Sequence, residues 1–215
     1  LPTAAGKSVI AGDFIRGLVQ KWPGQRVLVL THVKELISQN YEKLKTLWPD
    51  APAGIYSAGL KRRDTENSVI FAGIQSVHTR ASELGRFNLI LIDECHLVPA
   101  TGMGMYLRFL EAMKIINPNI RVIGLTATPY RLNSGSLIDG QDRLFTDIAY
   151  DVDVMRLVND GYLSPLVAKQ MDNELDLSGI HTRAGEFKAD ELHALTDDDA
   201  LARQVLIEIL AHGAQ

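Results

Sequence analysis

Short apolar runs alternate along this chain with longer amphipathic stretches, and this alternation constrains the fold more than any other feature. The runs are rich in valine, isoleucine and leucine and cover residues 27–31, 69–72, 89–92 and 122–125. Continuous runs of this kind predict strands of a parallel sheet that is covered on both faces. The stretches between them repeat apolar residues at helical spacing and predict helices over residues 8–22, 33–47 and 105–116. The sequence therefore predicts an α/β domain built from βαβ units.

The length and composition are ordinary for a globular protein, and they exclude several classes. The 215 residues suit one large domain, or one domain with an extension. The single cysteine excludes a disulfide framework and a cysteine-rich zinc site. No apolar run approaches the roughly 18 residues of a membrane span, and no charged and apolar leader opens the chain, so we expect a cytoplasmic protein without a membrane partner. The formal charge of −4 argues against coating nucleic acid by bulk charge but is compatible with a local groove.

The composition changes after residue 170, and we expect a domain boundary there. Residues 1–170 hold the predicted strands and helices, and residues 171–215 are expected to be a linker and the start of a second domain. The aspartates at 197–199 are suited to cap a last helix over 200–210. The chain opens inside a phosphate-loop pattern without the strand that normally precedes such a loop. We therefore expect a fragment that is truncated at its N-terminus.

The phosphate-loop pattern lies directly before the first predicted helix. Its core is Gly6-Lys7-Ser8, which follows Thr3, Ala4 and Ala5. Backbone N–H groups at such a helix start point at an anion, the lysine reaches the β- and γ-phosphates of a nucleotide, and the serine hydroxyl ligates Mg²⁺. The pattern departs from the usual one at Leu1, which stands in place of its first glycine, and at Ala4, where many phosphate loops have glycine. Taken alone, the pattern also fits a plain turn that is capped by the serine.

Two further motifs follow predicted strands. Asp93-Glu94-Cys95-His96 comes directly after the apolar run 89–92, at the edge of a parallel sheet where ligands bind. Asp93 is placed to hold Mg²⁺, and Glu94 is placed to orient or deprotonate an attacking water. Thr126-Ala127-Thr128-Pro129 follows the run 122–125, and its hydroxyls can hydrogen-bond His96. Taken alone, the first motif also fits an acidic strand end and the second an ordinary turn.

Together these three motifs resemble motifs I, II and III of superfamily 2 helicases and translocases of the DEAD/DEAH type, with DECH as the box. Residues 30–36 resemble motif Ia, and residues 57–63 and 71–77 resemble the next strand-contacting elements. The whole set is most similar to the RadD-type bacterial DNA-repair helicases. The resemblance covers about residues 1–170. It implies a RecA-like P-loop NTPase domain with a parallel sheet and helices on both faces, the first of two such domains.

The resemblance also implies an ATP-dependent DNA helicase or translocase and gives its residues roles. ATP and Mg²⁺ are the implied cofactors, bound by Thr3, Ala4, Ala5, Gly6, Lys7, Ser8 and Asp93, with Ser8 and Asp93 as metal ligands. The implied catalytic residues are Lys7, Asp93, Glu94 and His96, and the residues that couple hydrolysis to strand movement are Thr126 and Thr128. The implied donors to a nucleic-acid strand are Thr31, His32, Lys34, Gly59, Gln75 and Ser76.

The partners that the resemblance implies are nucleic acid, the second RecA-like domain of the same chain, and repair or replication proteins. The residues themselves do not distinguish DNA from RNA, and the RadD-type resemblance alone favours DNA. Two alternatives stay open: a catalytically degenerate nucleotide-binding scaffold, suggested by Ala4, and another P-loop enzyme such as a small kinase. The basic run Lys61-Arg62-Arg63 fits a solvated loop as well as a strand contact.

Overall fold

The chain forms two compact units in the computed structural model, residues 1–164 and residues 165–215. The described residues are 6–99, 104–131, 135–140, 143–165, 179–183, 186–187, 189–197, 203–207 and 210. The boundary predicted after residue 170 lies outside them, as do three predicted phosphate-loop residues, Thr3, Ala4 and Ala5.

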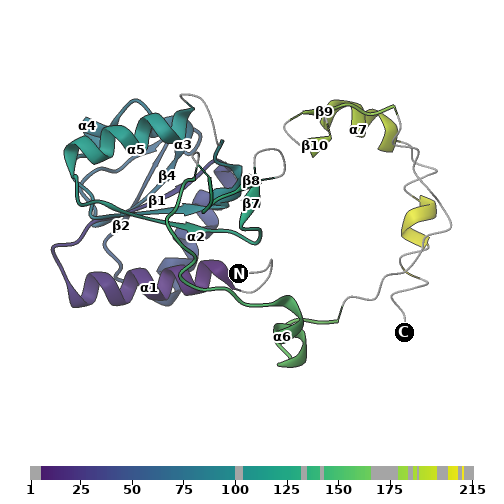
Figure 1. The fold of residues 1–215 in the computed structure, drawn as a ribbon, viewed down its shortest axis with the longest axis horizontal. Coiled ribbons are helices and arrows are strands. Elements are labelled where there is room, and N and C mark those ends of the chain that lie inside the picture. The colour runs from purple at the N-terminus through teal and green to yellow at the C-terminus, as the bar shows by residue number, and fades with distance from the viewer. Residues whose placement is uncertain are drawn as a thin grey trace. The chain divides into compact units, whose positions relative to one another are not determined.

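A six-stranded sheet forms the centre of the first unit, in the order β3-β2-β4-β1-β5-β6 (Figure 1). Its strands are β1 (Val27–Thr31), β2 (Ala53–Ser57), β3 (Arg62–Arg63), β4 (Val69–Gly73), β5 (Leu89–Asp93) and β6 (Arg121–Leu125). All neighbouring strands are parallel except β2 and β3, which pair antiparallel. The predicted α/β fold and its four strands are confirmed, while the antiparallel strand β3 makes the sheet a mixed one.

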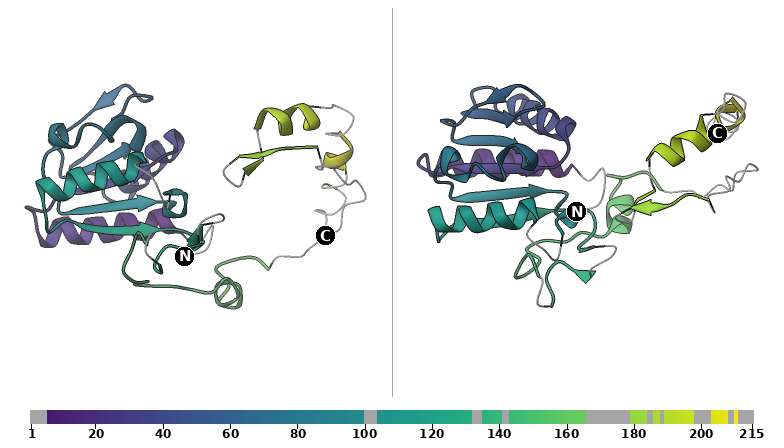
Figure 2. Two further views of the ribbon diagram at one scale, coloured as in Figure 1. Left: turned by 45° about the horizontal axis from the view of Figure 1, so that its top comes forward. Right: turned by 90° about the horizontal axis from the view of Figure 1, so that it is seen from above.

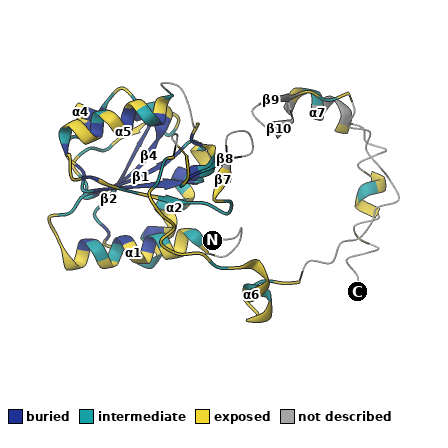
Figure 3. Cartoon of the chain, in the orientation of Figure 1, coloured by how far each residue is buried: buried dark blue, intermediate teal, exposed yellow. Residues whose placement is uncertain are grey.

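Helices cover both faces of this sheet (Figures 1 and 2). The helices are α1 (Lys7–Lys21), α2 (Lys34–Leu47), α3 (Ile74–Val77), α4 (Ala81–Leu84) and α5 (Met105–Ile116). Buried side chains of α1 and α2 pack with Val27 and Val29 on one face, and those of α3, α4 and α5 pack with Leu28 and Leu30 on the other. Successive strand residues point to opposite faces, so a strand buried on both faces needs an unbroken apolar run. Figure 3 shows the central strands β1 and β4 as buried along their length.

The remaining described elements are short. The first unit contains the 3₁₀ turn η1 (Cys95–Leu97), the antiparallel pair β7 (Tyr130–Arg131) and β8 (Gly135–Ser136), and α6 (Val154–Asn159). The second unit contains the antiparallel pair β9 (Thr182–Arg183) and β10 (Glu186–Phe187), and α7 (Ala189–Thr196). Within the predicted last helix, the described residues 203–207 and 210 are helical. In the part of the chain that the structure describes, no helix combines the length and apolar character needed to cross a membrane.

Gly124 in β6 allows the edge of the sheet to pack closely against the turn that follows β5. A Cβ atom at this position would lie 2.5 Å from Cys95 Sγ and would also overlap the Phe145 ring. Because Cys95 is buried, its side chain cannot move into solvent to relieve the overlap. We therefore expect Gly124→Ala to lower the free energy of unfolding by about 2 kcal/mol. The loss is measured as a shift of the urea midpoint at constant slope.

Gly17 is the matched control for that substitution. It is an exposed glycine inside α1, and a Cβ atom there would meet nothing within 4 Å. Gly17→Ala is therefore expected to raise the free energy of unfolding by about 1 kcal/mol, because alanine restricts the unfolded chain and favours the helix. A Gly124→Ala variant as stable as the unmodified chain would contradict the overlap.

Candidate functional site

The N-terminus of α1 lies at the carboxyl edge of the sheet, beside the end of β5. Gly6 precedes the helix in the left-handed region, with φ 77° and ψ 27°, a conformation that glycine adopts without steric cost. The first turn holds no acidic residue, and among the described residues no side chain caps it. The backbone N–H groups of the first turn and the positive end of the helix dipole therefore act together with Lys7. Such a helix start binds anions.

The end of β5 places two carboxylates beside this helix start. Asp93 is buried, with 8% of its surface exposed, and both of its oxygens accept hydrogen bonds. Oδ1 accepts from the Glu94 amide at 3.1 Å, and Oδ2 accepts from Asn40 Nδ2 at 2.9 Å. Glu94 itself adopts φ 51° and ψ 50°, a left-handed conformation that is strained for a residue with a side chain. Strain of this kind is concentrated at functional sites.

Asn40 is a site residue that the motifs did not predict. It lies on α2, three residues after the buried Ile37 and four before the buried Leu44, so it faces the sheet with them. Its amide fixes the orientation of the Asp93 carboxylate across the gap between helix and strand. A polar side chain on an apolar helix face was the one signal in the sequence that could have identified it.

A short chain of polar contacts links Lys7 to the end of β6. Lys7 Nζ lies 3.5 Å from Glu94 Oε1, and His96 Nδ1 lies 3.4 Å from Glu94 Oε2. His96 Nδ1 also lies 2.8 Å from Thr126 Oγ1. The Thr126 hydroxyl also donates to the Thr128 carbonyl at 2.9 Å and accepts from the Thr128 amide at 3.1 Å. The expected bond between His96 and Thr126 is present, while Thr128 joins through its backbone.

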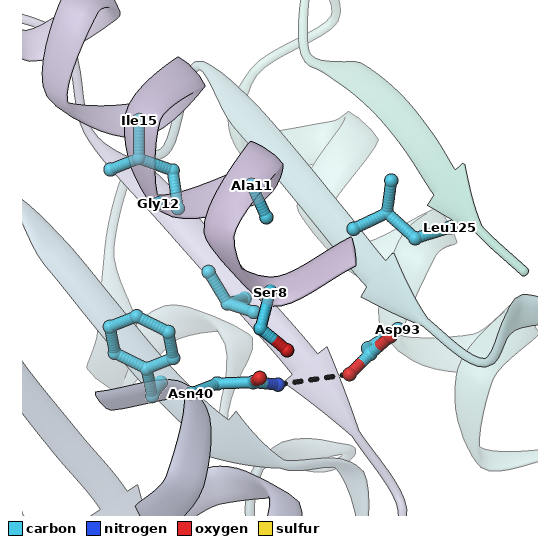
Figure 4. Close-up of a pocket in the computed structure, with 9 residues that line it drawn as sticks. Ser8, Ala11, Gly12, Ile15, Asn40, Asp93 and Leu125 are labelled. Atoms are coloured by element: carbon cyan, nitrogen blue, oxygen red, sulfur yellow. Dashed lines mark hydrogen bonds between the residues drawn. The ribbon is translucent and has the colours of Figure 1, made fainter. Parts of the chain in front are cut away.

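A small cavity of about 20 Å³ separates α1 from the sheet, and three polar side chains meet at it (Figure 4). They are Ser8, Asn40 and Asp93, and the other lining residues are Ala11, Gly12, Ile15, Val29, Phe71 and Leu125. Mg²⁺ prefers oxygen ligands and is held by one or two protein groups together with substrate phosphates and water. The Ser8 hydroxyl and the Asp93 carboxylate fit this pattern. Among the described residues, no three His, Cys, Asp or Glu side chains come close enough to hold a metal by themselves.

The residues expected to contact a nucleic-acid strand gather at the carboxyl ends of β1, β2 and β4. Gln75 Nε2 donates to the His32 carbonyl at 2.9 Å and so joins the loops after β4 and β1. The Ala58 amide donates to Ser76 Oγ at 3.0 Å, and Lys34 covers Gly59, where a Cβ atom would lie 3.1 Å from Lys34 Cδ. Five of the six predicted residues reach the surface: His32, Lys34, Gly59, Gln75 and Ser76. The sixth, Thr31, is buried with 2% exposed, and its hydroxyl accepts from the Val33 amide at 3.4 Å.

The basic run after β2 divides into residues with different surroundings. Lys61 turns the chain in the left-handed region, with φ 54°. Arg62 pairs with Asp64 at 2.6 Å and lies over the Tyr41 ring at 5.2 Å from its centroid, so it holds β3 against α2. Burial lowers the pKa of Arg62, but its hydrogen bonds to Asp64 and Tyr41 outweigh burial and raise the pKa above its ordinary value. Arg63, like Lys61 and Arg62, is exposed.

Comparison with known proteins places this geometry in a family. Residues 1–131 match the family described as the type III restriction enzyme, res subunit. Over its whole length the chain is 29% identical to IRC3 of Saccharomyces cerevisiae, which carries the name of an ATP-dependent helicase, and it covers 31% of that protein. It is 30% identical, over 55% of this chain and 13% of the relative, to the type I restriction enzyme EcoAI endonuclease subunit of Escherichia coli.

A solved structure shares the fold. The helicase domain of Hef from Pyrococcus furiosus superposes with a TM-score of 0.51 at 28% identity, over 62% of this chain and 30% of that chain. The mostly parallel sheet with helices on both faces is thus the RecA-like fold of helicases. The chain spans less than a third of the length of these relatives. Since the family match extends over more than half of its residues, the chain belongs to the family of the type III restriction enzyme res subunit.

Proposed function

We propose that this chain is the ATP-binding domain of a nucleic-acid-dependent ATPase, a helicase or translocase that acts on DNA. One observation carries the proposal: Lys7 at the start of α1 lies 3.5 Å from Glu94 at the end of β5. This contact brings the phosphate-loop pattern and the paired carboxylates into a single site. The helicase names of IRC3 and Hef support the same activity for domains of this fold.

The chemistry that follows is hydrolysis of the γ-phosphate of ATP. The first-turn amides of α1 and Lys7 bind the phosphates, together with Thr3, Ala4, Ala5 and Gly6 of the loop. Ser8 and Asp93 would hold Mg²⁺, which would supply positive charge to neutralise the phosphoryl group. Glu94 accepts a proton from the water that attacks the γ-phosphorus, while the bond to the ADP oxygen breaks. Glu94 also contacts His96, whose bond to Thr126 extends toward Thr128 and couples hydrolysis to movement.

The surface loops after β1, β2 and β4 are the proposed path of the DNA strand. His32, Lys34, Gly59, Gln75 and Ser76 offer backbone, hydroxyl, amide and lysine donors there, the kinds of group that contact phosphates without reading sequence. The resemblance to RadD-type repair helicases supports DNA as the strand. A second RecA-like domain, which residues 171–215 would begin, completes the ATP cleft in the full-length protein.

ATP turnover by the full-length protein tests this function. Phosphate release is measured with Mg²⁺ in four parallel reactions: without nucleic acid, with single-stranded DNA, with duplex DNA and with RNA of the same sequence. We expect turnover to rise at least tenfold with DNA, as positioning of the two domains on the strand completes the site. Stimulation by RNA alone would overturn the choice of DNA. A folded protein without turnover under every condition would support the scaffold alternative.

Asn40→Ala is expected to raise the Mg²⁺ concentration for half-maximal turnover by about tenfold. The substitution removes the hydrogen bond that orients Asp93 but leaves both proposed metal ligands in place, and partners of metal ligands typically have effects of about 10- to 100-fold. The measurement is a Mg²⁺ titration of turnover at saturating ATP.

Gln39→Ala is the matched control, since Gln39 is the exposed neighbour of Asn40 on α2. We expect its Mg²⁺ titration to coincide with that of the unmodified protein. A titration of Asn40→Ala that also coincides, in a protein with unchanged melting temperature, would show that the orientation of Asp93 does not depend on Asn40.

A further inference from the structure

A second, polar cavity of about 200 Å³ opens at the carboxyl end of β2, on the surface that carries the proposed strand path. It lies between β2, β3 and the turn that follows α3. Its polar lining comes from Tyr56, Arg63, Gln75, Ser76, Thr79 and Arg80. The motifs identified Gln75 and Ser76 of this set, and the basic run 61–63 left Arg63 open between a solvated loop and a strand contact. Thr79 and Arg80 have no role in the site described above.

Glu83, which is itself hydrogen-bonded to Tyr56, holds the Arg80 guanidinium in position. Arg80 Nη1 lies 3.0 Å from Glu83 Oε2, and the Tyr56 hydroxyl donates to Glu83 Oε1 at 2.6 Å. The Tyr56 and Arg80 hydrogen bonds lower the pKa of Glu83, so the carboxylate is ionised at neutral pH. The contact with Glu83 involves one guanidinium nitrogen, Nη1, and a guanidinium carries five N–H donors in all. A donor group fixed in advance loses less entropy when it binds a ligand.

The charges and donors of this cavity suit a singly charged phosphodiester. Two guanidiniums and one carboxylate leave a net charge of about +1. Arginine presents paired N–H groups that match two phosphate oxygens. Thr79 adds an exposed hydroxyl, and Ser76, which accepts from the Ala58 amide, can still donate its own hydrogen. The cavity therefore offers more hydrogen-bond donors than the neighbouring Glu83 carboxylate can accept from.

We propose that this cavity binds one backbone phosphate of the nucleic-acid strand, with Arg63 and Arg80 as its charged contacts and Thr79 as a hydroxyl donor. The proposal rests on the proposed function and extends it. Because Gln75 and Ser76 line the same cavity, the strand path predicted from the motifs continues across β3 by one further phosphate. The contact is to the backbone and carries no sequence preference.

The test uses the full-length protein and a fluorescein-labelled single-stranded DNA of mixed sequence. Affinity is measured between about 50 and 300 mM salt for the unmodified protein, Arg63→Gln, Arg80→Gln and Arg80→Lys. Each contact to a single strand contributes about 0.7 to the slope of log affinity against log salt. We expect each glutamine variant to lose about 0.7 from the slope and about tenfold in affinity at low salt. Arg80→Lys keeps the charge and is expected to keep the slope.

Arg121→Gln is the matched control, an exposed arginine at the opposite, amino end of the sheet, and its slope should equal that of the unmodified protein. Slopes of both glutamine variants equal to the control would overturn the phosphate site while leaving the proposed function intact. An unmodified protein that binds no nucleic acid would instead overturn the proposed function. Arg63 is exposed on β3, so its variant decides the question even if Arg80→Gln does not fold.

Discussion

Replacing Glu94 with glutamine is expected to lower ATP turnover by about 10³-fold and to leave nucleotide affinity within about threefold of its original value. The amide keeps the size of the carboxylate but cannot accept the proton of the attacking water, and a positioned general base contributes about 10²- to 10⁴-fold. Glutamine also ends the ion pair with Lys7, which lies 3.5 Å from Glu94. Lys7 then keeps its charge for the nucleotide phosphates, so binding has no reason to weaken.

Two measurements separate these effects. Phosphate release with Mg²⁺ and DNA reports turnover, and equilibrium binding of a labelled ATP analogue reports affinity. Glu111→Gln is the control, an exposed glutamate on α5, and it should behave like the unmodified protein in both assays. Turnover of Glu94→Gln within threefold of the unmodified protein would remove Glu94 from the role of base. Loss of nucleotide binding would show that its contact with Lys7 organises the phosphate site.

The left-handed backbone conformation of Glu94 is locally unfavourable but is stabilised by its surroundings. A residue with a side chain costs about 1–2 kcal/mol in this conformation, and it persists here because the structure around it fixes both neighbours. Asp93 is fixed by Asn40, and Cys95 is buried beside β6. The turn therefore directs two successive carboxylates into the same site, one toward Ser8 and one toward Lys7.

Much of the fold could be predicted from the sequence because its physical signals are local. β1, β4 and β5 are buried along their whole length, and apolar runs mark them and the more exposed edge strand β6 within one residue. β2 was missed because Ala53 and Gly54 weaken its apolar run, although four of its five residues are buried. Its strand character comes from pairing with β4, which a local pattern cannot reveal.

The candidate site was predictable only in part, for a related reason. Motif spacing identified Lys7, Glu94, His96 and Thr126, and the structure brings all four together. Contacts between residues that lie far apart in the sequence cannot be recognised from a short motif. Asn40 reaches Asp93 from 53 residues away, and the cavity around Arg63 and Arg80 draws on three separate segments.

Arg26 is the clearest case of a residue whose importance only the fold reveals. It lies just before β1, and its guanidinium donates to the carbonyls of Leu84 at 3.1 Å, Arg86 at 3.3 Å and Asn67 at 3.3 Å, and also to that of Thr65. Its Cζ atom lies 4.2 Å from the centroid of the Phe87 ring. Partial burial lowers the pKa of Arg26, although Glu66 acts in the opposite direction, and the group remains charged. One side chain thus joins the loops that lead into β4 and β5.

Arg26→Met is therefore expected to lower the free energy of unfolding by about 3 kcal/mol. The apolar side chain keeps the contact with Phe87 but leaves four backbone carbonyls without their donor, and hydrogen bonds to charged groups contribute about 1.5–3 kcal/mol each before water replaces some of them. Urea unfolding followed by tryptophan fluorescence measures the change, since Trp22 and Trp48 both lie in the first unit.

Two further variants identify the cause of that loss. Arg26→Lys keeps the charge but has only three donors at one point, so it cannot reach carbonyls on both loops, and we expect it to recover less than half of the loss. Arg108→Met, at an exposed position on α5, should change the free energy of unfolding by less than about 0.5 kcal/mol. Full recovery by lysine would mean that charge alone stabilises this end of the sheet. Partial recovery would mean that the fork of the guanidinium, which matches two loops at once, is what holds β4 and β5 in register with β1.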